Sequence, residues 1–207
     1  MERTMSLGYK LAYATGITPW ERAAEADGPG LDRLFGREEA DHGGPGRVLD
    51  LGCGSGEHTV ALAARGWKAT GIDQVGGALR RARQRAETQK VTAEFVQADV
   101  TALDPAQLGH GFDFFLDVGC FHGLSDPQRA AMGRSVTELA GPSATLLLLA
   151  FKAGAAPRPL PRGADTADIE RAFPLWRIVD TEAAVTEGLP KPLRRAAPSW
   201  YRLRHQP

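Results

Sequence analysis

The chain has 207 residues with 25 basic and 25 acidic side chains, so its formal net charge at pH 7 is zero. This length suits a single domain that buries roughly 70% of the surface its unfolded form exposes. The charge balance argues against a nucleic-acid partner, because a phosphate backbone is usually met by a clear basic excess. Only two cysteines are present and the first ten residues hold no apolar core of secretory length, so we expect a cytoplasmic protein without a membrane partner.

The first 46 residues precede the first predicted strand. Helical patches are expected there around residues 7–14, 21–26 and 31–39, with breaks at Gly16, Pro19 and Pro29. Tyr13 and Trp20 add aromatic surface to this segment. Because it comes before the sheet in the chain, the segment can lie across the sheet as a helical lid.

A glycine-rich turn follows the first predicted strand, in the stretch RVLDLGCGSGEHT of residues 47–59. The branched apolar residues indicate a buried strand, and the apolar repeat of residues 60–64 indicates the helix after the turn. Glycines 52, 54 and 56 can adopt positive φ and let the backbone approach a ligand closely. The N–H groups at the start of the helix then face whatever lies over the turn.

The spacing of these glycines separates two classes of ligand. The dinucleotide-binding pattern G-x-G-x-x-G requires a glycine at position 57, where the chain has Glu57. The chain has D-x-G-x-G-x-G instead, with Asp50 at the end of the strand. A carboxylate at this place would repel a pyrophosphate, whereas it suits a ligand that carries an ammonium group, as S-adenosylmethionine does. A plain tight turn is the alternative for the glycines taken alone.

This stretch resembles the first motif of the class I, Rossmann-like S-adenosylmethionine-dependent methyltransferases, and the resemblance runs from about Thr18 to Arg204. It implies an α/β fold, a three-layer sandwich around a seven-stranded, mostly parallel sheet of order 3-2-1-4-5-7-6. The last strand would be antiparallel, with helices on both faces of the sheet. The chain would then be one domain, 1–207, made of an N-terminal helical lid (1–45), a cofactor-binding half (46–152) and acceptor-side loops with a closing hairpin (153–207).

The next two predicted strands also end near acids. Residues 67–73 form a strand that ends at Asp73, where a carboxylate can accept both hydroxyl groups of a ribose. A helix N-cap is the alternative for this residue. The third strand, at 91–96, is followed by Asp99 and Val100. In the methyltransferases an acid here accepts from the adenine amino group and the next backbone N–H reaches a ring nitrogen; for Asp99, a surface turn is the alternative.

The stretch FDFFLDVGCFHGL, residues 112–124, holds the second informative motif. Its apolar run predicts the strand beside the first one, and the carboxyl end of that strand opens onto the ligand crevice. The pattern D-x-G-C-F-H-x-L from Asp117 onward resembles a small-molecule subgroup of these enzymes, in which the loop lines the methionine half of the cofactor and the acceptor. It contains neither the Asn/Asp-Pro-Pro-Tyr/Phe motif of amino-group DNA methylases nor the glutamate pair of arginine methylases.

His122 is the only histidine that the sequence places at this crevice. With an ordinary pKa of about 6.5, it can take a proton from a hydroxyl or thiol acceptor or hydrogen-bond the anion of that acceptor. A histidine tied to the backbone near the loop is the alternative. Cys120 is expected to be a small buried residue rather than a nucleophile, and no redox motif connects it with Cys53.

The rest of the chain completes the predicted fold. Helices are expected at 74–89, after Ser125 and at 165–173, and strands at 143–152, 176–180 and 199–204. Two loops that contain proline and arginine are expected at 154–163 and 188–198. The first of them is either a mobile loop over the acceptor site or a plain surface connection.

The resemblance assigns roles to individual residues. Cofactor contacts fall on the acids, the turn and one aromatic residue of the lid: Trp20, Asp50, Gly52, Cys53, Gly54, Asp73, Gln74, Asp99, Val100 and Asp117. Acceptor contacts fall on Tyr13, Cys120 and Phe121, and the catalytic role falls on His122. The pattern Y-x-x-G-x-T-P-W that ends at Trp20 resembles the segment that closes over the cofactor in the thiopurine-methyltransferase-like and tellurite-resistance-like branch. Trp20 can equally pack the lid onto the core.

The implied function is transfer of a methyl group from S-adenosylmethionine, which becomes S-adenosylhomocysteine. The acceptor would be S or O of a small-molecule thiol, phenol or other hydroxyl compound, in detoxification or secondary metabolism. A cofactor-binding module without catalysis and a nicotinamide oxidoreductase are the alternatives, and Asp50 with the missing third glycine disfavours the latter. No residue is assigned to a metal. Metal dependence and the oligomeric state stay open.

Overall fold

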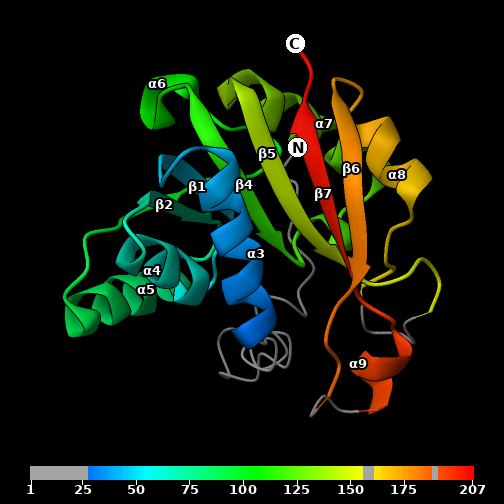
Figure 1. Ribbon diagram of the computed structural model, residues 1–207, viewed down its shortest axis with the longest axis horizontal. Coiled ribbons are helices and arrows are strands. Elements are labelled where there is room, and N and C mark those ends of the chain that lie inside the picture. The colour runs from blue at the N-terminus through cyan, green and yellow to red at the C-terminus, as the bar shows by residue number, and fades with distance from the viewer. Residues whose placement is uncertain (1–27, 156–160, 188–190) are drawn as a thin grey trace.

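The computed structural model describes residues 28–155, 161–187 and 191–207. Seven strands form one sheet in the order β3-β2-β1-β4-β5-β7-β6 (Figure 1). The strands are β1 (Arg47–Leu51), β2 (Lys68–Asp73), β3 (Glu94–Gln97), β4 (Phe112–Val118), β5 (Ala140–Ala150), β6 (Trp176–Ala183) and β7 (Ser199–His205). Only β7 runs against its neighbours, β5 and β6. The predicted strand order and the antiparallel last strand are confirmed.

Helices cover both faces of the sheet (Figure 1). One face carries α3 (Gly28–Asp41), α4 (Glu57–Ala64) and α5 (Gly76–Gln89). The other face carries α6 (Pro105–Leu108), α7 (Asp126–Leu139) and α8 (Thr166–Ala172). The short helix α9 (Lys191–Arg195) and the 3-10 turn η1 (Phe121–Gly123) complete the described elements. No helix in these described ranges is long and apolar enough to cross a membrane.

Strand β4 lies near the centre of the sheet and is buried on both faces. Phe112, Phe114, Phe115 and Leu116 are each fully buried. Because successive side chains of a strand point to opposite faces, Phe114 and Leu116 pack in the cluster that includes α3 and α4, and Phe115 packs in the cluster of α7 and α8. This continuous apolar run is typical of a strand in a parallel sheet covered on both sides.

Several predicted boundaries differ from those of the structure. Strand β3 begins at Glu94 rather than at residue 91. Strand β5 spans Ala140–Ala150 rather than 143–152, and the register shift opposite β4 accommodates its Gly-Pro pair. The predicted loop at 188–198 contains α9. Pro29 lies in the first turn of α3 rather than at a break, at a place where its missing N–H costs nothing.

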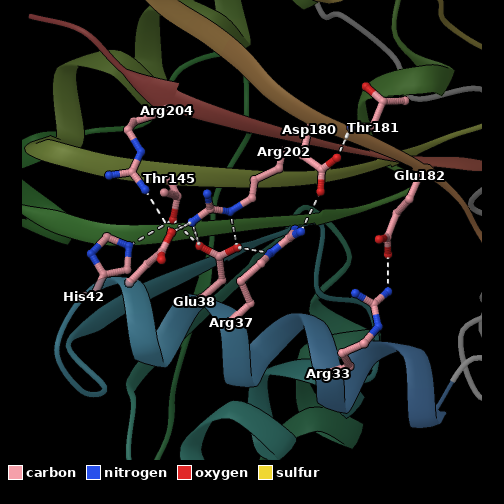
Figure 2. A network of polar contacts seen from close by, with 11 residues as sticks. Arg33, Arg37, Glu38, His42, Thr145, Asp180, Thr181, Glu182, Arg202 and Arg204 are labelled. Carbon is pink, nitrogen blue, oxygen red and sulfur yellow. Dashed lines mark hydrogen bonds and ion pairs between the residues drawn. The ribbon is translucent and has the colours of Figure 1, made fainter.

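Helix α3 is fixed to the sheet by buried polar contacts (Figure 2). Glu38 is fully buried and accepts hydrogen bonds from Arg202 Nε at 2.7 Å, Arg202 Nη2 at 2.9 Å and Thr145 Oγ1 at 2.7 Å. Arg202 also pairs with Asp41. Further pairs join α3 to β6: Arg37 with Asp180, and Arg33 with Glu182. The described part of the predicted lid is therefore a helix on a sheet face, while Tyr13 and Trp20 lie outside the described residues.

Arg202→Met removes the guanidinium that neutralises Glu38. A carboxylate left buried without its cation costs about 3–5 kcal/mol, so the free energy of unfolding, measured by urea denaturation at pH 7, should fall by that order. The double variant Glu38→Met/Arg202→Met should recover most of the loss, since neither charge is then buried alone. Arg33→Met is the control, because its pair with Glu182 is exposed and should cost about 0–1 kcal/mol. Equal losses in the two single variants would contradict burial as the cause.

Candidate functional site

The glycine turn lies at the end of β1 and has the predicted backbone conformation. Gly52, Gly54 and Gly56 have φ angles of 74°, 53° and 76°. The Cys53 N–H donates to the carbonyl of Ile72 at 2.8 Å, which ties the turn to the end of β2. Gly56 has a packing role as well, because a Cβ there would lie 2.6 Å from the Cβ of Ala82 on α5. The turn therefore positions α4 tightly against its neighbour.

Asp73 links the second strand to this turn. Its Oδ2 accepts the N–H of Gly54 at 3.0 Å, and its Oδ1 accepts the N–H of Val75 at 2.7 Å. Val75 itself, not Asp73, is the N-cap of α5, and its apolar side chain makes no capping hydrogen bond. A carboxylate oxygen can accept two hydrogen bonds. These contacts are therefore compatible with a diol that donates to the same oxygens.

Asp99 lies after β3 and forms the turn that the sequence left as an alternative. Its Oδ1 accepts the backbone N–H of Thr101 at 2.8 Å and the Thr101 hydroxyl at 2.7 Å. Oδ2 receives no hydrogen bond from the residues that the structure describes. The next residue, Val100, is buried in the core. Asp99 thus shapes a turn with one oxygen and still offers the other oxygen to a ligand.

Asp50 and Asp117 are both buried, at the ends of the adjacent strands β1 and β4. Asp50 accepts the hydroxyl of Thr59 at 2.5 Å, and its burial raises its pKa to about 7. Asp117 accepts the N–H groups of Cys120 at 2.8 Å and Phe121 at 2.9 Å, and burial, with the neighbouring Asp50, raises its pKa to about 7. In this arrangement Asp117 holds the loop after β4 in shape with both oxygens.

His122 is almost fully buried in the 3-10 turn η1. Its Nδ1 accepts the backbone N–H of Phe151 at 3.1 Å, and its ring stacks on the ring of Phe151 with centroids 4.5 Å apart. Burial, and after it the cation of Arg129, lower the pKa of His122 to about 3. The imidazole is then neutral with its proton on Nε2. This argues against proton uptake by His122 near neutral pH and leaves donation of a hydrogen bond to an anion.

The remaining predicted site residues in the described ranges include Phe121, the two cysteines and Gln74. Phe121 is fully buried against Phe173, and its predicted contact with the acceptor stays a prediction. Cys120 is partly exposed and lies against the turn, since a Cβ on Gly52 would come 3.1 Å from Cβ of Cys120. Burial raises the pKa values of both thiols, Cys53 and Cys120, well above their ordinary range, as expected for unreactive cysteines. The backbone carbonyl of Gln74 accepts a hydrogen bond from the side-chain amide of Gln97 at 3.0 Å.

Three residues of the site escaped the sequence analysis. Thr59 was in the quoted motif, nine residues after Asp50, but nothing marked its hydroxyl as the partner of that acid. Phe151 and Arg129 act on His122 from other elements and carry no local signal. Within the described ranges, no group of three or more His, Cys, Asp and Glu side chains is placed to hold a metal ion.

The two raised carboxyl pKa values predict that stability falls with pH. Folded Asp50 and Asp117 keep a proton up to about pH 7, whereas the unfolded chain releases it near 4, so the folded state loses stability between these values. We expect the free energy of unfolding to fall by an amount on the order of 3 kcal/mol per group between pH 4.5 and 8. Asp50→Asn should flatten this slope, and the exposed Asp104→Asn should not. Parallel slopes in the wild type and Asp50→Asn, measured by urea denaturation, would contradict the assignment.

Comparison with known proteins agrees with this geometry. A family model described as a methyltransferase domain matches residues 48–143. An uncharacterised methyltransferase of Schizosaccharomyces pombe is 31% identical over 104 residues, which are 50% of this chain and 70% of the relative. Thiocyanate methyltransferase 1 of Brassica oleracea is 29% identical over 149 residues, 70% of this chain and 61% of the relative. A methyltransferase of Geobacillus sp. is 46% identical over 72 residues, and the match spans only 27% of that relative.

Solved structures share the fold. The 1,6-didemethyltoxoflavin N1-methyltransferase of Burkholderia thailandensis has a TM-score of 0.75 at 22% identity, over 97% of this chain and 86% of that one. The magnesium protoporphyrin IX methyltransferase of Synechocystis has a TM-score of 0.70 at 21% identity, over 95% and 97% of the two chains. Fold, glycine turn and sequence relatives lead to one conclusion: the chain belongs to the class I, S-adenosylmethionine-dependent methyltransferase family.

Proposed function

We propose that this protein transfers the methyl group of S-adenosylmethionine to a sulfur or oxygen atom of a small-molecule thiol or hydroxyl compound, in detoxification or secondary metabolism. The observation that carries the proposal is the contact of Asp73 with the glycine turn, beside Asp50 and Asp99 at one edge of the sheet. Two relatives are named for small acceptors that offer sulfur or oxygen. Thiocyanate, in the name of the Brassica oleracea enzyme, carries sulfur. Trans-aconitate carries carboxylate oxygens; the trans-aconitate 2-methyltransferase of Paracidovorax citrulli is 48% identical over 60 residues, 28% of this chain and 22% of the relative.

The donor groups of S-adenosylmethionine fit the acceptor groups of the site. The cofactor has an ammonium group, a ribose diol and an adenine amino group, and all three donate hydrogen bonds. Asp50 would favour the ammonium, Asp73 the diol, and Asp99 with the backbone N–H of Val100 the adenine. Gly52 and Gly54 have positive φ angles and no side chains, so a ligand can approach the backbone of the turn closely. When bound, the cofactor supplies a methyl group made electrophilic by its sulfonium charge.

His122 would act on the acceptor as a hydrogen-bond donor. Its Nδ1 is engaged by Phe151, so Nε2–H is the group left to donate to an acceptor anion. The new S–CH₃ or O–CH₃ bond forms as the C–S⁺ bond breaks, and the electron pair of that bond goes to the cofactor sulfur. Because His122 takes up no proton, the acceptor must release its own proton to water. This favours a thiol with pKa near 8.5 over a phenol with pKa near 10.

Binding of the cofactor is tested by isothermal titration calorimetry with S-adenosylmethionine. We expect saturable binding by the wild type and a loss of affinity of about 100-fold or more in Asp73→Ala, since the carboxylate both holds the turn and accepts the diol. Asp104→Ala is the control, because this exposed acid only caps α6. No binding by the wild type, or equal affinities for wild type and Asp73→Ala, would end the proposal.

The role of His122 is tested by mass spectrometry of methylated products, with thiophenol and phenol as matched acceptors. We expect faster methylation of thiophenol, and a fall in turnover of about 100-fold in His122→Ala with cofactor affinity preserved. The wild-type rate should show no inflection between pH 5 and 7 from His122, whose pKa lies near 3. An inflection in that range that disappears in His122→Ala would instead identify the histidine as a base.

A further inference from the structure

A closed ring of contacts holds His122 where β4 and β5 end. The His122 carbonyl accepts Nη2 of Arg129 at 3.2 Å, and the same nitrogen donates to the carbonyl of Gly163. The N–H of Ala164 donates to the carbonyl of Phe151 at 2.9 Å. The N–H of Phe151 in turn donates to Nδ1 of His122 at 3.1 Å. The ring therefore joins three segments that are distant in the sequence, and Arg129 closes it.

Arg129 is a buried cation on α7, with 2% of its surface exposed. Its Nε donates to the carbonyl of Phe121 at 3.3 Å, and its guanidinium carbon lies 4.8 Å from the centre of the Phe121 ring. Asp168 of α8 provides the balancing charge, 2.9 Å from Nη1. Nη1 nevertheless has no hydrogen bond of good geometry among the described residues. Burying such a pair is often no better for stability than an apolar side chain of similar size, so stability alone does not account for it.

We propose that Arg129 is a positioning residue, which fixes the ring of His122 against the segment after β5 so that Nε2–H presents one orientation to the acceptor. This rests on the role proposed above for His122. The guanidinium donates to three carbonyls from two of its nitrogens, Nε and Nη2, while Nη1 faces Asp168. A lysine has a single nitrogen and cannot reproduce this fork. Arg162 also links these segments, through the carbonyl of Leu124 and an ion pair with Asp126. It is exposed, however, and takes no part in the closed ring of contacts.

The charge of Arg129 and its geometry can be separated by substitution. Arg129→Lys keeps a cation but loses this fork, whereas Arg129→Met loses both. Several charged groups lie on the segments packed around His122. They are Arg129, Asp168 paired with it, Asp117, which accepts the N–H of Phe121, and Lys152, which follows Phe151 in the chain. Arg134→Met is the matched control, because Arg134 is exposed on the same helix.

The experiment is NMR of the full-length protein labelled with ¹⁵N-histidine, in which the loss of a signal in His122→Gln identifies His122. In the wild type we expect a neutral Nε2–H imidazole with a hydrogen-bonded Nδ1 and no titration between pH 5 and 7. Arg129→Met should change the Nδ1 signal and raise the pKa of His122 by about 1 or more, toward its ordinary value. Arg129→Lys should change the Nδ1 signal while the pKa stays low. Arg134→Met should change neither.

A folded Arg129→Met protein with the wild-type Nδ1 signal would overturn the proposal. Should that variant lack a cooperative thermal transition, Arg129→Lys decides, and an unchanged Nδ1 signal there would overturn it equally. These signals need no turnover, so they stand apart from a failure of the wild type to methylate thiophenol. With thiophenol as acceptor, Arg129→Lys should lower kcat about 10-fold at unchanged affinity for S-adenosylmethionine. An equal loss of cofactor affinity would point to general disruption and contradict positioning.

Discussion

The parallel pairing of β1 with β2 and β4 is the constraint on which the site depends. Its register sets Asp50 opposite Gly71 and Leu51 opposite Asp117, so the acids emerge at one edge of the sheet. Because side chains alternate between the two faces of a strand, a slip of one residue would carry Asp50 to the opposite face. The buried phenylalanines of β4 prevent such a slip, since each face of that strand packs against its own helices. Core packing and ligand geometry are therefore fixed by the same register.

Burial controls the protonation of the residues that this register brings together. Asp50 and Asp117 hold protons up to about pH 7, and His122 stays neutral down to about pH 3. Near pH 6 these three ionisable side chains are therefore largely uncharged. A cationic ligand beside Asp50 would favour the ionised carboxylate and release a proton. Binding of such a ligand would therefore be coupled to the loss of a proton from Asp50.

Local features of the site could be predicted from the sequence, whereas features that depend on packing could not. Positive φ at Gly52 and Gly54 follows from residue type and spacing, and the position of Asp73 follows from the strand that it ends. The strand order came from the family resemblance rather than from the residues themselves. The state of His122 is set by Phe151, 29 residues further along the chain, and by a buried arginine on another helix. Exposure of a loop residue such as Phe121 likewise depends on what packs over it.

Helix α3 and strand β7 are neighbours in space although 164 residues separate Glu38 from Arg202. During synthesis the helix is made well before the strand that supplies its buried cation, which lies 164 residues further along the chain. Until then Glu38 lacks the buried guanidinium of Arg202 and gains by remaining in water. Contacts between such distant segments form late, because a long loop must close before they contribute. Docking of the helix would then wait for β7, and a protein truncated before that strand would leave the helix without its anchor.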